Sequence, residues 1–177
     1  LCVPIVNKYG KTIGVTQVLN KHGGPFTNED ESRLRAFTAQ ISIALENAKL
    51  FADVHNMKNY NEAMLESMSN AVVTLDDGGK IATCNAAGLK ILQVGPEQIL
   101  QKQVADFFGG ANDWILERLK RVDETAAADM FMDAELSVGD EKVSANVTIL
   151  PLFNMEKKRL GSMLLIEDIS SEKRMKS

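Results

Sequence analysis

The stretch NAVVTLDDGGKIATCN, residues 70–85, decides the fold of this chain. Two short runs rich in Val, Ile and Thr lie on either side of the turn sequence Asp77-Gly78-Gly79. Glycine accepts the positive φ angles of tight turns, so this pattern predicts two antiparallel strands. Asn85 ends the second run and is a good N-cap for the helix expected in AAGLKILQV, residues 86–94. The stretch therefore predicts a hairpin that leads directly into a helix.

The residues that follow complete a small domain over 59–170. The run 112–125, NDWILERLKRVDET, has the apolar spacing of an amphipathic helix. Three further strands are expected at 129–138, 141–153 and 160–170, and polar and apolar residues alternate in the first two. Two strands, several helices and then three strands predict an α+β fold: a five-stranded antiparallel sheet with flanking helices.

The residues that precede this domain predict a second hairpin and one long helix. The apolar runs LCVPIV (1–6) and TIGVTQVL (12–19) flank a connection that contains glycine. From Phe26 to Asp77 there is neither Gly nor Pro, so a continuous helix is expected over 28–68. Thr27 is a suitable N-cap, and Asp30 three residues later resembles the second half of a capping box.

An apolar seam runs along the first part of this predicted helix. Its members recur at steps of three and four residues: Leu34, Phe37, Ile41, Leu45, Ala48 and Phe51. Such spacing is typical of helices that pair with another helix, so a parallel homodimer through 34–68 is expected. The alternative is that the seam packs on the hairpin or on the following domain.

The order of elements from Tyr60 to Ser170 resembles a PAS domain. The resemblance rests on Asp77-Gly78-Gly79-Lys80-Ile81 leading to Asn85-Ala86-Ala87, and on Glu167-Asp168-Ile169-Ser170 at the end. The last group resembles the terminal Asp-Ile-Thr motif of the family, with Ser in place of Thr. The resemblance implies that Asp168, Ile169 and Ser170 form the exit of the domain. Residues 171–177 would then begin an exit signalling segment.

Residues 1–50 resemble the C-terminal part of a GAF domain. Asn20, Lys21, Phe26, Asp30 and Glu31 match the signature Asn-Lys…Phe-x-x-x-Asp-Glu of cyclic-nucleotide-binding GAF domains in phosphodiesterases and cyanobacterial adenylyl cyclases. The resemblance implies a structural ion pair between Lys21 and Asp30 that joins hairpin to helix. It also implies cAMP binding by the intact GAF domain, most of which would lie upstream of Leu1.

The order GAF then PAS is similar to the regulatory region of cyanobacterial class III adenylyl cyclases. This resemblance implies a signal relay that ends in a cAMP-synthesising domain downstream of Ser177, with the present chain itself not an enzyme. Two alternatives stay open: a PAS domain that senses a small ligand on its own, and the sensory region of a histidine kinase. The absence of an initiator Met favours a piece of a longer protein.

Composition argues against several other functions. A net charge of −4 disfavours nucleic acid as the main partner, because phosphate binding requires a basic face. The two cysteines, Cys2 and Cys84, fit a reducing, cytoplasmic compartment. No apolar run reaches the roughly 18 residues of a membrane span, so no membrane partner is expected.

Catalytic and cofactor sites are not expected from the sequence either. No Cys/His spacing is typical of zinc, and both histidines, His22 and His55, precede the PAS-like core, where a haem ligand would be needed. Gly78-Gly79 and Gly109-Gly110 are turns rather than phosphate-binding loops. Cys84, at a strand end, is expected to be a small buried thiol.

Overall fold

The computed structural model describes residues 1–176, which fall into two compact units. The first comprises residues Leu1–Asn61 and the second begins at Glu62. The longest helix, α1 (Asn28–Ser67), contributes to both. Each unit is described by itself.

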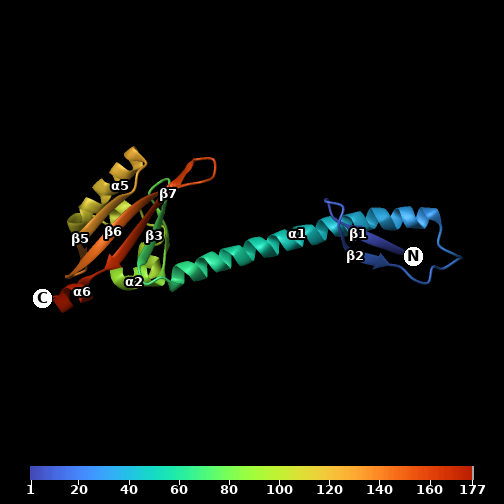
Figure 1. Ribbon diagram of the computed structural model, residues 1–177, viewed down its shortest axis with the longest axis horizontal. Coiled ribbons are helices and arrows are strands. Elements are labelled where there is room, and N and C mark those ends of the chain that lie inside the picture. Colours follow the sequence, from blue (N-terminus) through green and yellow to red (C-terminus); the bar gives the residue numbers. More distant parts are fainter. Residues whose placement is uncertain (177) are drawn as a thin grey trace. The chain divides into compact units, whose positions relative to one another are not determined.

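The first unit is a hairpin against which α1 packs (Figure 1). Strands β1 (Cys2–Val6) and β2 (Thr12–Gln17) are antiparallel, and Val3 and Ile5 of β1 are its buried residues. The contact with α1 uses small polar side chains. The Ser42 hydroxyl donates to the Val6 carbonyl at 2.7 Å, and Thr38 Oγ1 lies 3.3 Å from Thr16 Oγ1.

The second unit contains a five-stranded antiparallel sheet with the order β4-β3-β7-β6-β5. Its strands are β3 (Ala71–Asp76), β4 (Ile81–Cys84), β5 (Asp129–Val138), β6 (Glu141–Phe153) and β7 (Arg159–Asp168). Between β4 and β5 lie α2 (Ala86–Leu92), α3 (Pro96–Ile99), α4 (Val104–Phe107), the 3₁₀ helix η1 (Gly110–Asn112) and α5 (Asp113–Thr125). Helix α6 (Ser170–Lys176) follows the sheet. The predicted α+β fold is confirmed: a long helix precedes a five-stranded antiparallel sheet with flanking helices.

The core of this unit lies between the sheet and the helices, with α2 packed against β3 and α5 against β6 (Figure 1). Period-two alternation puts every second residue of a strand into the core. On α5, steps of four and three residues give one buried stripe. The buried residues of these elements are Ala145, Val147 and Ile149 on β6, Leu164 and Ile166 on β7, and Ile115, Leu119 and Val122 on α5.

One glycine allows two central strands to approach closely. Gly161 of β7 has φ of +150°, and a Cβ atom at this position would lie 1.8 Å from the carbonyl oxygen of Leu75 on β3. No side chain fits there, so only glycine can occupy this position without a shift of the backbone.

The long helix ends at Ser67, one residue before the expected boundary at residue 68. The Ser67 hydroxyl donates to the Met64 carbonyl at 2.8 Å, and the Met68 N–H donates to the Leu65 carbonyl at 3.3 Å. These contacts to the third residue back tighten the last turn and satisfy carbonyl groups that a helix end leaves free.

Candidate functional site

The corner between hairpin and helix, residues 20–31, is organised around Asp30. Its Oδ2 lies 2.5 Å from Lys21 Nζ, which also donates to the Pro25 carbonyl at 3.3 Å. The Thr27 N–H donates to the same carboxylate at 2.8 Å, while the Asp30 N–H donates to Thr27 Oγ1 at 3.3 Å. This reciprocal pair is a capping box. Asp30 therefore both begins α1 and holds the preceding loop.

These contacts favour the charged form of Asp30. The hydrogen bond from Lys21, followed by the Thr27 N–H, lowers the pKa of Asp30 from 3.8 to about 2. Because folding lowers this pKa, the contribution of the carboxylate to stability is present above the unfolded value of 3.8. It is lost as the pH falls toward 2.

The other three signature residues of the corner, Asn20, Phe26 and Glu31, do not take part in the contact between Lys21 and Asp30. Asn20 has a left-handed backbone with φ of 59°, a conformation that Asn tolerates better than most residues. Phe26 is half-buried, and Glu31 pairs along the helix with Arg35 at 2.8 Å. The structure thus brings Lys21 and Asp30 together but directs Glu31 elsewhere. The role of the five residues together as a structural clasp between hairpin and helix stays a prediction.

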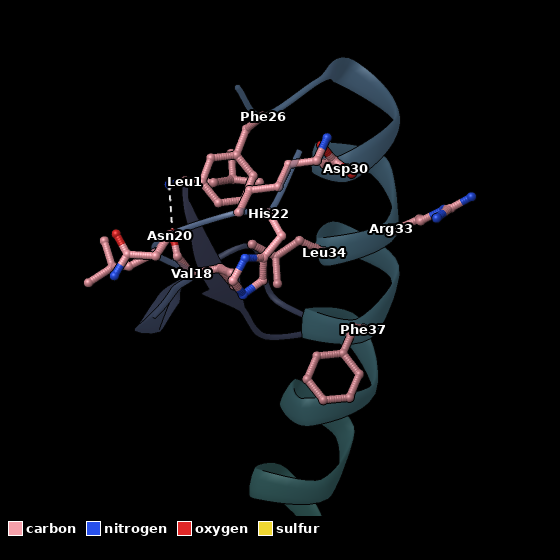
Figure 2. A pocket seen from close by; sticks show the side chains of 11 residues that line it. Leu1, Val18, Asn20, His22, Phe26, Asp30, Arg33, Leu34 and Phe37 are labelled. Atoms are coloured by element: carbon pink, nitrogen blue, oxygen red, sulfur yellow. Dashed lines mark hydrogen bonds and ion pairs between the residues drawn. The ribbon is translucent and has the colours of Figure 1, made fainter. Parts of the chain in front are cut away.

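An open pocket of about 430 Å³ lies beside the corner (Figure 2). Its walls are mainly apolar, with polar groups from the corner and from α1 at the sides. Figure 2 shows the side chain of Arg33 pointing away from the pocket, whereas the His22 ring lies between the hairpin and α1. Such a lining suits an apolar side chain or a small apolar group. The apolar lining residues are Leu1, Val18, Leu19, Phe26, Leu34 and Phe37.

Replacing Lys21 tests the electrostatics of the corner. In Lys21→Met we expect the pKa of Asp30 to rise from about 2 toward 3.8, because the ammonium is lost, and to stay below 3.8, because the Thr27 N–H remains. Carboxyl-carbon NMR titration measures this value. The matched control is Arg35→Met, which removes the exposed ion pair with Glu31 and should leave Asp30 unchanged. An unchanged Asp30 titration in Lys21→Met would contradict the assignment.

A second arrangement of polar groups forms a joint between the end of α1 and the sheet. Asn85, 3% exposed, makes four hydrogen bonds through its side chain. Nδ2 donates to the Leu65 carbonyl at 2.9 Å and to the Asn70 carbonyl at 3.0 Å. Oδ1 accepts from the N–H groups of Val72 and Gly88, each at 2.9 Å. Both N–H groups and both lone pairs of this amide are therefore hydrogen-bonded. These four bonds connect α1, the following turn, β3 and α2.

A carboxylate of α1 completes the joint. Glu66 Oε2 accepts from the Ala86 N–H at 2.8 Å, in the first turn of α2. Negative charge is favourable at a helix N-terminus. The sequence predicted Asn85 only as a cap. Its bonds to Leu65 and Asn70 could not be predicted from the sequence, because the acceptors are backbone carbonyls, which every residue has.

The predicted exit residues hold the start of α6 against β6. The Ile169 N–H donates to the Ser144 carbonyl at 2.9 Å, and Ser170 Oγ accepts from the Ser144 N–H at 3.2 Å. Asp168 Oδ1 accepts from the Ser170 N–H at 2.9 Å, which turns the chain out of β7. The exit segment therefore begins at a fixed place on the sheet. Ser177, included in the expected exit segment, lies outside the described residues.

The predicted seam of α1 is covered unevenly in its own unit. Leu34 and Ile41 are half-buried, whereas the remaining four members are exposed: Phe37, Leu45, Ala48 and Phe51. Burial by the hairpin thus reaches only part of the seam. A homodimer through it stays a prediction.

Groups that could support other chemistry are few in the described part of the chain. Residues 1–176 contain no cluster of three or more His, Cys, Asp or Glu that could hold a metal ion. Burial raises the pKa of Cys84 to about 11, which disfavours the reactive thiolate. No helix in the described range combines the length and apolar character that a membrane crossing requires.

Comparison with known families agrees with this architecture. A family model described as the PAS fold matches residues 65–174. The chain belongs to the PAS fold family. A GAF domain model matches residues 1–45, the hairpin and the first part of α1. Two sensory-domain families therefore account for most of the chain, and a regulatory role in signal transduction follows.

The curated relatives include cyclic nucleotide phosphodiesterases. A probable 3',5'-cyclic phosphodiesterase, pde-5 of Caenorhabditis elegans, is 31% identical over 110 residues, which cover 62% of this chain and 14% of the relative. The dual 3',5'-cyclic-AMP and -GMP phosphodiesterase 11A of Takifugu rubripes is 37% identical over 83 residues, 46% of this chain and 9% of the relative. The chain thus spans less than a sixth of these relatives. They give no support to the expected likeness to adenylyl cyclases.

Solved structures show the likeness of fold. The PAS domain of a Colwellia psychrerythraea protein covers 65% of this chain and 98% of its own, with a TM-score of 0.55 and 14% identity. The E. coli DhaR(N)-DhaL complex covers 93% of this chain and 53% of the matched chain, with a TM-score of 0.56 and 17% identity.

Proposed function

We propose that the chain is a dimeric relay within a cyclic-nucleotide signalling protein. A cyclic nucleotide, cAMP in the first instance, binds the intact GAF domain to which residues 1–45 belong. The resulting change passes along α1 to the PAS domain and leaves through α6 toward an output domain. The GAF signature and the phosphodiesterase relatives support the choice of ligand class.

The joint at Asn85 is the observation that carries this proposal. A change at the end of α1 acts directly on the Leu65 carbonyl, which is bonded to the side chain that also holds β3 and caps α2. The exit residues are bonded to β6 in the same sheet. Hydrogen-bonded elements of this kind can transmit a displacement when they have two discrete arrangements that the ligand distinguishes.

Two output reactions are candidates. One is cyclisation of ATP to cAMP by a downstream cyclase domain, which the GAF-then-PAS order suggests. The other is hydrolysis of a cyclic nucleotide, which the named relatives favour. Assays of the full-length protein for both reactions, each with and without added cAMP, distinguish them. A response of neither reaction to cAMP would contradict cAMP as the ligand of the intact GAF domain.

The relay itself is tested with Asn85→Ser in the full-length protein. Serine retains an oxygen that can cap α2 but is too short to reach the Leu65 and Asn70 carbonyls. We expect the change in output activity caused by cAMP to fall about tenfold, with the unstimulated rate retained, which corresponds to a coupling loss of about 1.4 kcal/mol. The control is Asn154→Ser, in the β6–β7 turn. A folded Asn85→Ser protein with the full response would contradict the relay.

A further inference from the structure

Helix α6 is attached to the sheet at its first turn and, further along, by an ion pair. Ile169 and Ser170 bind Ser144, which holds the start of the helix on β6. Lys173 follows Ser170 by three residues, so it lies on the same helical face, and its Nζ pairs with Oδ1 of Asp133 on β5. A helix of seven residues is too short to be stable alone in water. The position of α6 therefore depends on these contacts.

A β-bulge places Asp133 for this ion pair. The register between β5 and β6 shifts between Phe131 and Ala134, so that two residues of β5 oppose the single residue Asn146 of β6. Asp133 has a left-handed backbone with φ of 56°, which Asp adopts more readily than most residues. A bulge redirects the side chains of its strand. It therefore determines where the carboxylate that binds α6 lies.

The side chain of Asn146 holds this bulge in place. Its Oδ1 accepts from the Asp133 N–H at 3.0 Å, and its Nδ2 donates to Glu167 Oε2 of β7 at 3.0 Å. One amide thus connects the bulge to the strand that leads into α6. We call Lys173, Asp133 and Asn146 the exit latch.

An open cavity of about 540 Å³ is bounded by both α6 and α2. Helix α6 contributes Ser170, Glu172 and Arg174 to its walls, and α2 contributes Lys90 and Ile91. Figure 1 shows the two helices at the same end of the sheet. The cavity therefore gives α6 room to shift toward α2.

Two oppositely charged side chains on this cavity have no ion-pair partner among the described residues: Lys90 of α2 and Glu172 of α6. A shift of α6 into the cavity would bring Glu172 toward Lys90 and take Lys173 away from Asp133. The other charged residues of the cavity already hold contacts: Glu141, Lys142, Glu167, Asp168 and Arg174.

The energies of the two arrangements are comparable in kind. The side chains of Lys173 and Asp133 are 50% and 53% exposed, and Lys90 and Glu172 are exposed as well. An exposed ion pair changes an equilibrium by about fivefold at most. Neither pair is strong enough to fix α6 permanently, so a modest signal can shift the balance between them.

We infer that α6 has two positions: one on β5, held by the exit latch, and one across the cavity on α2, held by Lys90 and Glu172. This inference rests on the proposed relay function and deepens it, because a relay requires an outgoing element with two discrete arrangements. A change that reaches the sheet alters the output by shifting the ratio of the two positions.

Amide NMR spectra of the 177-residue chain test the two positions. Asp133→Asn removes the carboxylate of the latch without changing α6, and Asn tolerates a left-handed backbone. Lys90→Met removes the ammonium on α2. The matched control is Glu135→Gln, which neutralises the β5 partner of Lys142 in another exposed ion pair. The reporter is the backbone N–H signal of Met175 in α6.

We expect Asp133→Asn and Lys90→Met to move the Met175 signal in opposite directions along one line, with the unchanged chain between them. Fast exchange gives one averaged signal whose displacement reports the ratio of the positions, and slow exchange gives two signals whose intensities report it. Each variant should change this ratio about threefold, and Glu135→Gln should leave it unchanged.

Different results would overturn different parts of the inference. An unmoved signal in Asp133→Asn would overturn the exit latch. The second position would be overturned by an unmoved signal in Lys90→Met, by movement of both variants in the same direction, or by movement of Asp133→Asn toward the value of an unstructured segment.

The relay is tested separately, because the NMR experiment contains no cyclic nucleotide. In the full-length protein, Asp133→Asn should change the unstimulated output activity about threefold, in step with the ratio of the positions. An unchanged output activity in a variant whose Met175 signal has moved would overturn the part of α6 in the relay. Loss of the cAMP response in the unchanged protein would instead contradict the relay itself and leave the NMR result standing.

Discussion

Asn85→Ala is expected to lower the free energy of unfolding of the second unit by about 3 kcal/mol. The substitution removes a helix cap, worth about 1 kcal/mol, and takes this partner away from the Val72 N–H and the Asn70 carbonyl. The Leu65 carbonyl keeps the N–H of Met68 at 3.3 Å but loses the shorter bond from Asn85. The Asn85 side chain is buried, so water cannot easily replace all four bonds. Urea unfolding, followed by the fluorescence of Trp114 in α5, reports on this unit.

A second asparagine provides the matched control. Asn154 Oδ1 accepts from the N–H groups of Glu156 and Lys158, both at 2.9 Å, in the turn between β6 and β7. These bonds are exposed, so Asn154→Ala should cost less than about 1 kcal/mol. Equal losses of unfolding free energy in the two variants would mean that the buried bonds of Asn85 stabilise the unit no more than the exposed bonds of Asn154.

Gly161→Ala is expected to destabilise the second unit by more than about 4 kcal/mol and to prevent folding at elevated temperature. A methyl group would overlap the Leu75 carbonyl oxygen, and a φ of +150° is in addition unfavourable for alanine. Because β3 and β7 pair from Ala71–Ile166 to Asp76–Gly161, relief of the overlap requires separation of two central strands. Thermal unfolding of Gly161→Ala and of the unchanged chain, followed by circular dichroism, measures this loss of stability.

Gly139→Ala separates backbone strain from overlap. Gly139 also has a positive φ, +58°, but a Cβ atom there would meet no atom within 4 Å. Its substitution should cost only about 1 kcal/mol, the penalty of a left-handed backbone for alanine. If Gly161→Ala were as mild as this control, the close approach of β7 to β3 would not be needed for the fold.

The strands of the second unit could be predicted because local signals agree with one another. The alternation in 129–138 and 141–153 has a period of two, and Gly139-Asp140 between them is a turn sequence, so β5 and β6 begin and end where expected. The continuity of α1 followed from the absence of Gly and Pro after Thr27, but its end did not, because that absence continues to Asp77. Sequence patterns are sufficient to predict an element when neighbouring residues alone determine its conformation.

The covered side of α1 could not be predicted in the same way. Its contact with the hairpin uses Thr38 and Ser42, which hydrophobic periodicity passes over, while the apolar residues Ile43 and Leu50 remain exposed. Steps of three and four residues exist on more than one face of this helix, so periodicity alone cannot choose among them. The direction of the hairpin, a tertiary property, decides which face is free.

The joint at Asn85 was likewise only partly visible. Its capping role follows from its position before a helix, whereas its bonds to Leu65 and Asn70 depend on where the end of α1 lies. The ion pair of Lys21 with Asp30 came from a family signature rather than from a pattern of spacing.

The unbroken helix from Asn28 to Ser67 has a consequence for anyone who recombines this region with other modules. Each residue inserted or deleted within it rotates everything downstream by about 100° and moves it by about 1.5 Å. A deletion of seven residues leaves the direction of the downstream side chains within about 20° of the original, whereas a deletion of three or four residues turns it by about 60° or 40°. Chimeric proteins spliced in multiples of seven should therefore respond to their input, and those spliced at intermediate lengths should be locked or unresponsive.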